Sequence, residues 1–484
     1  MAKWLKATDE VISRLEEEYI AGKKRTEEFY SEKITDSVYY ISSVRGNDEN
    51  DGRSPERPWK SCSMLASAEI VRGDTVLFEC GSVFREQIDI ISGVTYSSYG
   101  YGEKPLFYGS FDASGKDSWE RVDEDIYRYK EYIDMYKDIG NVVFDGGKAW
   151  GIKIQKCDDC DMSLALKEVT NGIEFFGDIA SVPFERADQL PKVDLAYFHS
   201  NDGHIYLCCK NGSPTDRFSS IELSRSIKIF NSYSYTEDVS FSNLHFSCVA
   251  CFAIRMSGCK NITVRNCSFE FIGGAIQFGY ECPWRNYRTR YGNAIENWGS
   301  CIGMTVENCY FNQIYDAGIT TQTNDATARM EDLCYCGNVF NCNQYAFELW
   351  AGGSESHFEN ITINGNIGKN TGGGMTTQRP DKGHESFFNS KGRHQIENCA
   401  VTGNISIGSV GCMMRSNRFC SKDYNGGYFL DRNVYVHELG KCFALISKEY
   451  PEFSGDIAPI DYCEEKIKLL ENPLFEQNGI FYYL

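Results

Sequence analysis

Three acidic residues stand out because apolar and aromatic neighbours surround them. Glu296 lies in Ile-Glu-Asn-Trp, Asp316 in Ile-Tyr-Asp-Ala-Gly and Glu348 in Phe-Glu-Leu-Trp. Apolar surroundings raise the pKa of a carboxyl group, which suits a general acid. Cleavage of a glycosidic bond usually needs two carboxyl groups, one as acid and one as nucleophile or base. The three residues are therefore candidate catalytic groups, although outward carboxylates on a strand can also simply solvate its surface.

Two tryptophans accompany the glutamates. Trp298 and Trp350 each follow a candidate glutamate by two residues, so they share its face if the segments are strands. Aromatic rings there would stack on sugar rings, or would pack in a core.

Polar and basic residues in nearby segments are candidates for binding a sugar. Amide, guanidinium and imidazole groups donate hydrogen bonds to hydroxyl groups, although the same residue types also occupy ordinary polar turns. The candidates are Gln322, Gln378, Arg379 and His384, together with Trp284 and Arg288 in the basic and aromatic segment 280–293. That segment would form a wall of the site, where it binds an acidic sugar or neutralises neighbouring carboxylates.

The elements that position these residues come from an imperfect repeat. Short β-branched segments end near an asparagine at intervals of 23 to 42 residues, and each precedes a second short strand. The asparagines are Asn243, Asn266, Asn308, Asn338, Asn366 and Asn404. Short strands without a helical period exclude helical repeats and favour a parallel β-helix, in which a ladder of asparagines occupies the turns.

Alignment of the repeats predicts which side chains share a column. One inward column is expected to hold Ile276, Ile319, Phe347, Met375 and Met413, and Cys267 and Cys309 are expected to share another. The residues that follow the first column should form an outward ladder of Gln277, Thr320, Glu348 and Thr376, with Glu296 in the equivalent place after Ile295. Glu296 and Glu348 would then lie two repeats apart, about 9.6 Å. Asp316 would enter the strand between them.

Three segments resemble a known superfamily. They are residues 39–61, the strand GDTVLFECGSVF at 73–84, and residues 290–322. They resemble the first coils and the repeats of pectate-lyase-like proteins, and in particular bacterial β-helix glycoside hydrolases. The resemblance covers residues 38–437. It implies an all-β fold, a right-handed parallel β-helix with a short N-terminal helical segment, and glycoside hydrolase activity.

The expected organisation has three parts. Residues 1–37 form an N-terminal segment with an amphipathic helix at 8–32, since Val11, Leu15 and Tyr19 recur every four residues. Residues 38–437 form the β-helix, with insertions at 111–225 and 280–293. Residues 438–484 form a capping or docking segment.

Composition narrows the partners and the location. A net charge of −19 disfavours nucleic acid, and no apolar run is long enough to span a membrane. The N-terminal residues lack the pattern of a secretory signal and the chain has 21 cysteines, so free thiols in the cytoplasm are expected. Cys157–Cys160 and Cys248–Cys251 have zinc spacing but lack a second pair, so neither a metal nor a cofactor is expected.

Three functions remain open. The first is a glycoside hydrolase that acts on oligosaccharides or glycosides. The second is a polysaccharide lyase of the same fold, and the third is a non-catalytic carbohydrate-binding β-helix. The sequence leaves open the sugar, the anomer, the stereochemical outcome and the oligomeric state, a homo-oligomer included.

Overall fold

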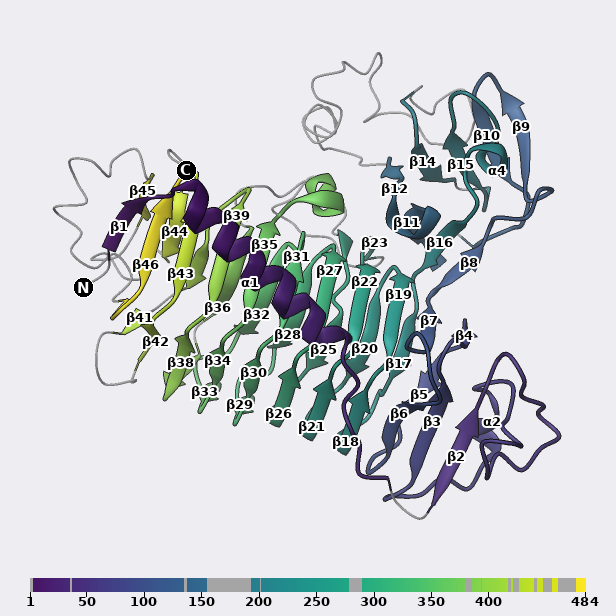
Figure 1. Cartoon of the computed structure of the whole chain (residues 1–484), viewed down its shortest axis with the longest axis horizontal. Helices are drawn as coiled ribbons and strands as arrows, with labels where there is room; N and C mark the ends of the chain where they lie inside the picture. Colours follow the sequence, from purple (N-terminus) through teal and green to yellow (C-terminus); the bar gives the residue numbers. More distant parts are fainter. Residues whose placement is uncertain are drawn as a thin grey trace.

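The computed structural model contains mainly β-strands (Figure 1). It describes residues 3–34, 37–134, 137–154, 193–200, 202–277, 290–379, 385–392, 394–416, 419–420, 426–438, 442–446, 455–459 and 476–484. The prediction of an all-β protein with an N-terminal helix is confirmed. Among the described residues, no helix has the length and apolarity needed to cross a membrane.

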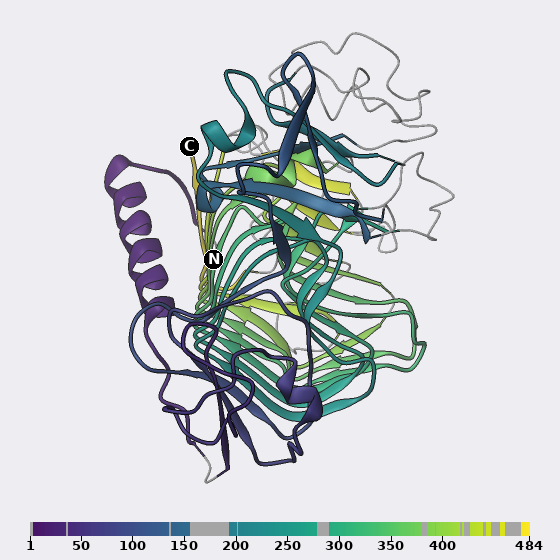
Figure 2. The ribbon, with the colours of Figure 1, turned by 90° about the vertical axis from the view of Figure 1, so that its right-hand side faces the viewer.

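Three large sheets make up most of the molecule, and nearly all their strands pair in parallel. From β18 onward the chain passes from sheet B to sheet A to sheet C and back again, and we call one such passage a repeat. Seen down the long axis of the molecule, the strands of successive repeats lie behind one another (Figure 2). Each strand therefore bonds to its counterpart in the next repeat, as the sequence predicted for Asn266 and Asn308.

The strands of each sheet are given in the order in which they pair. Sheet A contains β1 (Lys3–Lys6), β46 (Ile480–Tyr483), β43 (Val434–His437), β39 (Ile405–Ser409), β35 (Ile367–Thr371), β31 (Val339–Asn341), β27 (Tyr310–Ile314), β22 (Ser268–Ile272), β19 (His245–Val249), β7 (Leu106–Tyr108) and β4 (Val83–Phe84). Sheet B contains β2 (Val38–Ile41), β3 (Thr75–Glu79), β6 (Thr95–Tyr99), β18 (Thr236–Ser242), β21 (Cys259–Arg265), β26 (Cys301–Glu307), β30 (Cys334–Cys336), β34 (Thr362–Asn364), β38 (Cys399–Thr402), β42 (Tyr428–Asp431) and β41 (Phe419–Cys420), with β29 (Arg329–Glu331), β33 (His357–Glu359) and β37 (Gln395–Glu397) beside it. Sheet C contains β45 (Gly455–Pro459), β44 (Cys442–Ile446), β40 (Met414–Ser416), β36 (Ser386–Gly392), β32 (Tyr345–Ala351), β28 (Ala317–Thr323), β25 (Ile295–Trp298), β20 (Phe252–Met256), β17 (Lys228–Asn231) and β5 (Ile88–Asp89).

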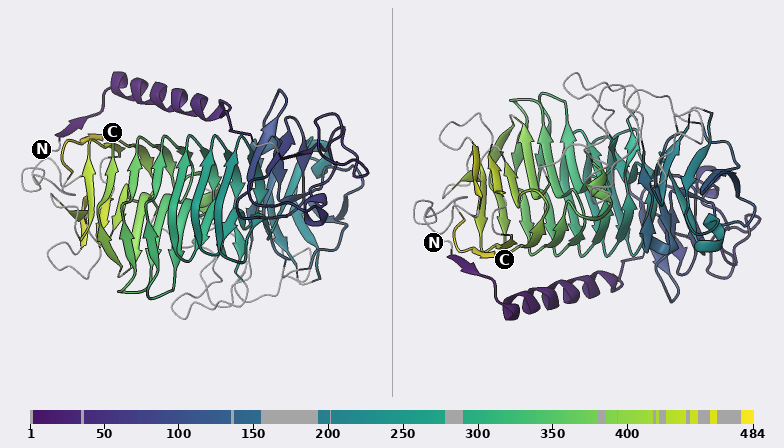
Figure 3. Two further views of the ribbon diagram at one scale, coloured as in Figure 1. Left: turned by 90° about the horizontal axis from the view of Figure 1, so that it is seen from below. Right: turned by 90° about the horizontal axis from the view of Figure 1, so that it is seen from above.

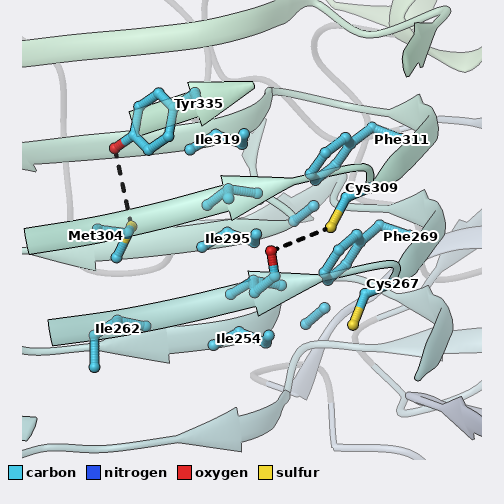
Figure 4. Close-up of a cluster of buried hydrophobic side chains, with 14 of the residues drawn as sticks. Ile254, Ile262, Cys267, Phe269, Ile295, Met304, Cys309, Phe311, Ile319 and Tyr335 are labelled. Atoms are coloured by element: carbon cyan, nitrogen blue, oxygen red, sulfur yellow. Dashed lines mark hydrogen bonds between the residues drawn. The ribbon is translucent and has the colours of Figure 1, made fainter. Parts of the chain in front are cut away.

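The core between the sheets is built from like residues stacked on like. Phe269, Phe311 and Phe340 stack with ring centroids 4.9 and 4.8 Å apart. Cys267 and Cys309 lie beside this stack in one column, as predicted (Figure 4). Both thiols are buried, so here cysteine serves as a small apolar residue.

Part of the predicted inward column is wrong. Ile319 and Phe347 do pair in sheet C, but their partners on either side are Ile295 and Phe388. Ile276 belongs to the separate hairpin of β23 (Ala275–Ile276) and β24 (Arg290–Tyr291). The prediction also failed for the two repeats that follow Phe347, where the loop before the strand of sheet C differs in length. Met375 lies in the 3₁₀ helix η4 (Gly374–Gln378), and Met414 rather than Met413 pairs with Phe388.

The predicted asparagine ladder separates into two columns. Asn243, Asn266 and Asn308 have positive φ and occupy the turn itself, which Gly337 and Gly365 take in later repeats. One residue further along, Asn338, Asn366, Asn404 and Asn433 form a buried ladder. In that ladder each side-chain oxygen accepts hydrogen bonds from the backbone and side chain of the asparagine before it, at 2.9–3.0 Å. The sequence alignment had merged these neighbouring positions.

The N-terminal helix lies along the outer face of sheet A (Figures 1 and 3). It is α1 (Asp9–Glu27), which is shorter than the predicted 8–32, and the Thr8 side chain caps it. Leu15 is buried against Ile367, Ile405 and Val436, which extend outward from the sheet. Strand β1 pairs with β46, so the two ends of the chain lie together.

The region predicted as an insertion contains two small sheets with a core of their own (Figure 1). One is formed by β12 (Ala149–Trp150), β11 (Ile139–Phe144), β16 (Ile221–Arg225) and β8 (Ser110–Asp112). The other is formed by β13 (Ile152–Lys153), β14 (Ala196–His199), β15 (Ile205–Cys208), β10 (Ile126–Tyr129) and β9 (Trp119–Asp123). The short helices η2 (Asp145–Gly147) and α4 (Pro214–Arg217) belong to this region, whereas α2 (Met64–Ser67) lies between β2 and β3. Asn141 donates to the Gly273 carbonyl at 2.8 Å, so this unit docks on the repeats beside β23.

Candidate functional site

The candidate glutamates lie in one column on the outward side of sheet C. Strand pairing places Thr320 between Glu296 and Glu348, so the predicted two-repeat separation is confirmed. An arginine flanks this part of the column on either side, and the members in order are Arg255, Glu296, Thr320, Glu348, Asn389 and Arg415. Asn389 replaces the predicted Thr376, and Gln277 lies outside the column.

Glu296 is almost fully buried and is surrounded by neutral donors. Its carboxylate accepts hydrogen bonds from Asn293 Nδ2 at 2.6 Å and from Gln322 Nε2 at 3.1 Å. Burial raises the pKa of Glu296 to about 7; these two amides act against the rise and the charge on Glu348 adds to it. The side chain therefore titrates near neutral pH, where it can serve as a proton donor.

Glu348 is equally buried, but a cation accompanies it. Lys391 Nζ lies 2.9 Å from Glu348 Oε1, and Asn389 Nδ2 donates to the same oxygen at 3.0 Å. Burial lowers the pKa of Lys391, but the charge on Glu348, the hydrogen bond to Glu348 and the Tyr345 side chain together leave that pKa raised. Lys391 thus gives the Glu348 carboxylate a counter-charge, as suits a base or nucleophile.

Asp316 enters β28 at the turn before Ala317, next to an arginine. Arg379 Nη1 lies 3.0 Å from Asp316 Oδ1 and also donates to the Tyr315 carbonyl at 3.3 Å. The Tyr315 ring has two guanidinium neighbours, Arg290 at 4.4 Å and Arg379 at 5.3 Å from its centroid. The backbone N–H of Tyr345, on the strand of Glu348, donates to the Asp316 carbonyl at 3.2 Å. Asp316 thus immediately precedes β28 and lies four residues before Thr320 of the glutamate column.

The two predicted tryptophans lie together in the adjacent outward column. Strand pairing places Gln322 between Trp298 and Trp350 and places Lys391 after Trp350. The two indole rings have centroids 6.3 Å apart and are tilted by 40°. Trp298 is 37% exposed, so this pair is not part of the core.

Other predicted binding residues are placed differently or lie outside the described residues. The Gln378 side chain accepts from Lys153 N and donates to the Gly151 carbonyl, so it joins η4 to the inserted sheets. Trp284, Arg288 and His384 lie outside the described residues.

Sequence reasoning missed Asn293, Asn389 and Lys391. The segment Ser-Phe-Phe-Asn-Ser-Lys-Gly has the same pattern as Tyr-Ala-Phe-Glu-Leu-Trp-Ala and would have identified the last two.

Two buried polar atoms of the glutamate column have no hydrogen-bond partner within the described part of the chain. They are Thr320 Oγ1, between the two glutamates, and Asn389 Oδ1, beside Glu348. Buried polar groups normally have partners, so water or a ligand hydroxyl group is expected there. Across the described ranges, no three His, Cys, Asp or Glu residues gather closely enough to hold a metal ion.

Comparison with known proteins gives partial matches, and no family model matches the chain. A lacto-N-biosidase from Bifidobacterium longum subsp. longum is 38% identical over 118 residues, which are 22% of this chain and 7% of the relative. The chain therefore spans only a small fraction of that relative.

Similar solved structures include XylC in complex with xylose, with a TM-score of 0.42, 14% identity, and coverage of 92% of this chain and 82% of that one. A second structure, described as a glycoside hydrolase, has a TM-score of 0.44 and 11% identity, with coverage of 92% of this chain and 96% of that one. The GH136 lacto-N-biosidase from Eubacterium ramulus has a TM-score of 0.41 and 12% identity, with coverage of 98% of this chain and 71% of that one.

Proposed function

We propose that this protein is a glycoside hydrolase, with its active site on the outward side of sheet C in a right-handed parallel β-helix. The observation that carries the proposal is the pair of buried glutamates in one column with opposite surroundings. Neutral amides accompany Glu296 and an ammonium group accompanies Glu348. Paired carboxyl groups whose surroundings separate their pKa values are the arrangement that acid–base cleavage of a glycoside requires.

The surroundings assign a role to each carboxyl group. Glu296, with a pKa of about 7, is the general acid that protonates the leaving oxygen. Glu348, paired with Lys391, is the base that activates water. The two-repeat separation of the strands, about 9.6 Å, is at the upper edge of the range that leaves room for a water molecule between base and sugar, so it favours inversion at the anomeric carbon over retention. Asp316, paired with Arg379, is the other candidate base and is the partner that the sequence favoured for Glu348.

The substrate class that we propose is an oligosaccharide or a simple glycoside. The exposed tryptophan pair beside the glutamates supports a sugar platform. The stretch shared with a lacto-N-biosidase supports the same class, although it covers a small part of either protein. Protonation of the leaving oxygen by one carboxyl group and deprotonation of water by the other need neither a metal ion nor a cofactor.

Activity of three isosteric variants tests the proposal. A panel of nitrophenyl glycosides and oligosaccharides first identifies a substrate. Glu348→Gln and Asp316→Asn are each expected to reduce kcat at least about a hundredfold if both touch the reacting atoms. Glu296→Gln should lose much more activity on oligosaccharides than on nitrophenyl glycosides, because nitrophenolate leaves without protonation. The kcat/KM of the unmodified protein should fall above pH of about 7, and Glu296→Gln should lose that decline.

A matched control is Glu307→Gln. Glu307 lies on the outer face of sheet B, paired with Arg265, and its variant should keep the activity of the unmodified protein. Near-normal activity in all three site variants would place the site elsewhere. Products that absorb as unsaturated sugars would indicate a lyase, and tight binding without any turnover would indicate a carbohydrate-binding protein.

We also propose that the protein acts in the cytoplasm on imported sugars. Fifteen cysteines of the described ranges are free thiols, which is typical of a reducing compartment.

A further inference from the structure

The outward column of the tryptophans continues toward the N-terminal repeats. Asn231, Arg255 and Glu296 pair in register, and Ser232 N donates to the Arg255 carbonyl at 2.9 Å, which extends the ladder past β17. Tyr233 follows Asn231 by two residues, as Trp298 follows Glu296 and Trp350 follows Glu348. Aromatic residues thus recur in every second repeat, with Ser257 and Gln322 in the positions between them.

The Tyr233 ring is held in place although it is largely exposed. Lys228 Nζ lies 4.8 Å from the ring centroid and bonds to the phenol oxygen at 3.3 Å. The Arg255 guanidinium lies 5.9 Å from the same centroid. Both cations belong to strands β17 and β20, so they contact the ring from the side of the sheet. The side chain as a whole is 74% exposed, which leaves surface available for stacking.

Arg255 connects this ring to the glutamate column. Its Nη1 donates to the Ser232 carbonyl at 3.3 Å, beside Tyr233, and its Cα is paired with that of Glu296 on the next strand. Single exposed aromatic residues are common on protein surfaces. Tyr233 differs because an anchoring residue links it to the candidate acid and because it shares the register of the two tryptophans.

We propose that Tyr233 is an outlying sugar subsite, and that the substrate is an oligosaccharide that lies across the strands of sheet C. This inference rests on the proposed function. A sugar ring that stacks on Tyr233 would lie two repeats, about 9.6 Å, from the one at Trp298. A monosaccharide glycoside bound at the glutamates would not reach it. Tyr233 therefore contributes to binding only when the substrate is a longer chain.

A substrate-length series tests the subsite. For Tyr233→Ala, kcat/KM should fall about fivefold to tenfold on oligosaccharides that extend beyond Trp298, as expected for a lost aromatic stack. The same variant should act normally on a nitrophenyl monoside, and Tyr233→Phe should act normally on every substrate. Tyr101→Ala is the matched control, because Tyr101 is fully exposed in the loop between β6 and β7.

The outcomes separate the two proposals. If glycosides are hydrolysed but Tyr233→Ala changes the activity by the same factor at every chain length, or not at all, the subsite proposal is wrong. The proposed hydrolase activity is then unaffected. If no glycoside is turned over, the affinity for the same oligosaccharide series is measured by calorimetry. A weaker affinity of Tyr233→Ala for the long members alone would then support the subsite, and equal affinities would overturn it.

Discussion

At the scale of single residues, the contrast between Glu296 and Glu348 comes from the groups that contact each carboxylate. Both carboxyl groups are nearly excluded from solvent, at 3% and 5% exposure, so both lose hydration on folding. Lys391 places a positive charge beside Glu348, whereas Gln322 and Asn293 donate neutral hydrogen bonds to Glu296. For Glu296, burial outweighs these hydrogen bonds and the charge of Arg255, and this favours the neutral acid.

The burial of Glu296 should make the free energy of unfolding depend on pH. Because burial raises the pKa of Glu296 from 4.5 to about 7, its contribution to the free energy of unfolding is complete below pH 4.5 and is lost as the pH rises through about 7. Glu296→Gln removes the titration, so its stability relative to the unmodified protein should increase between pH of about 5 and about 8. Urea midpoints at both pH values measure the difference. A pH-independent difference would show that Glu296 titrates as in the unfolded chain.

Cysteine reactivity should be concentrated at one pair. Cys334 and Cys336 point outward from β30 with sulfur atoms 3.0 Å apart, whereas thirteen further cysteines are buried. The hydrogen bond from Cys336 lowers the pKa of Cys334 to about 7, although partial burial opposes this. Iodoacetamide at neutral pH should therefore label Cys334 first, as read by peptide mass spectrometry. Under denaturing conditions close to 21 thiols should titrate; a loss of ten or more would refute the expectation of free cysteines.

At the scale of elements, the buried asparagine ladder fixes successive turns at a constant spacing. Asn366 donates to the Tyr335 carbonyl and the Asn404 side chain and accepts from Asn338, all within the core. Asn366→Ala leaves several buried groups unpaired and should cost about 3 kcal/mol of unfolding free energy. Asn364→Ala, two residues earlier on a half-buried side chain, should cost under about 1 kcal/mol. Equal costs in urea unfolding would mean that the ladder adds no stability.

At the scale of the whole molecule, a buried ion pair helps to dock the inserted sheets on the repeats. Lys153 Nζ lies 2.5 Å from Asp138 Oδ2, and the same oxygen accepts from Ile276 N at 2.7 Å. His199 Nδ1 lies 4.0 Å from the other carboxylate oxygen. The carboxylate therefore joins the two small sheets to β23, near the arginines that flank Tyr315.

Removal of the carboxylate charge tests this junction. Asp138→Asn leaves the Lys153 ammonium group buried without a counter-charge, which should cost about 3 to 5 kcal/mol. Combination with Lys153→Met should restore most of the loss, because the uncompensated charge is then absent. Urea unfolding of the two single variants and the double variant measures the coupling. Additive losses would show that the pair is not an energetic unit.

The sequence determined the class of the fold and the register of the site. Short strands with recurring small and β-branched residues cannot bury their faces alone, so they pair with their counterparts in neighbouring repeats. The period of two residues along a strand then placed Trp298 beyond Glu296 and Trp350 beyond Glu348 without further information. Counting repeats from Ile319 to Phe347 likewise placed Thr320 between the glutamates, as strand pairing confirms.

Only the tertiary structure decided which groups surround each carboxylate. Lys391 reaches Glu348 from the next strand, after a loop whose length varies between repeats. The sequence alignment had missed this strand, because it assigned the place of Asn389 to Thr376. Arg379 reaches Asp316 from beyond η4, and Asn293 reaches Glu296 from outside its strand. Hydrogen bonds between main chains repeat with the strand and can be counted along a sequence. Side-chain contacts across loops depend on how each loop closes, so the acid and the base could be told apart only in three dimensions.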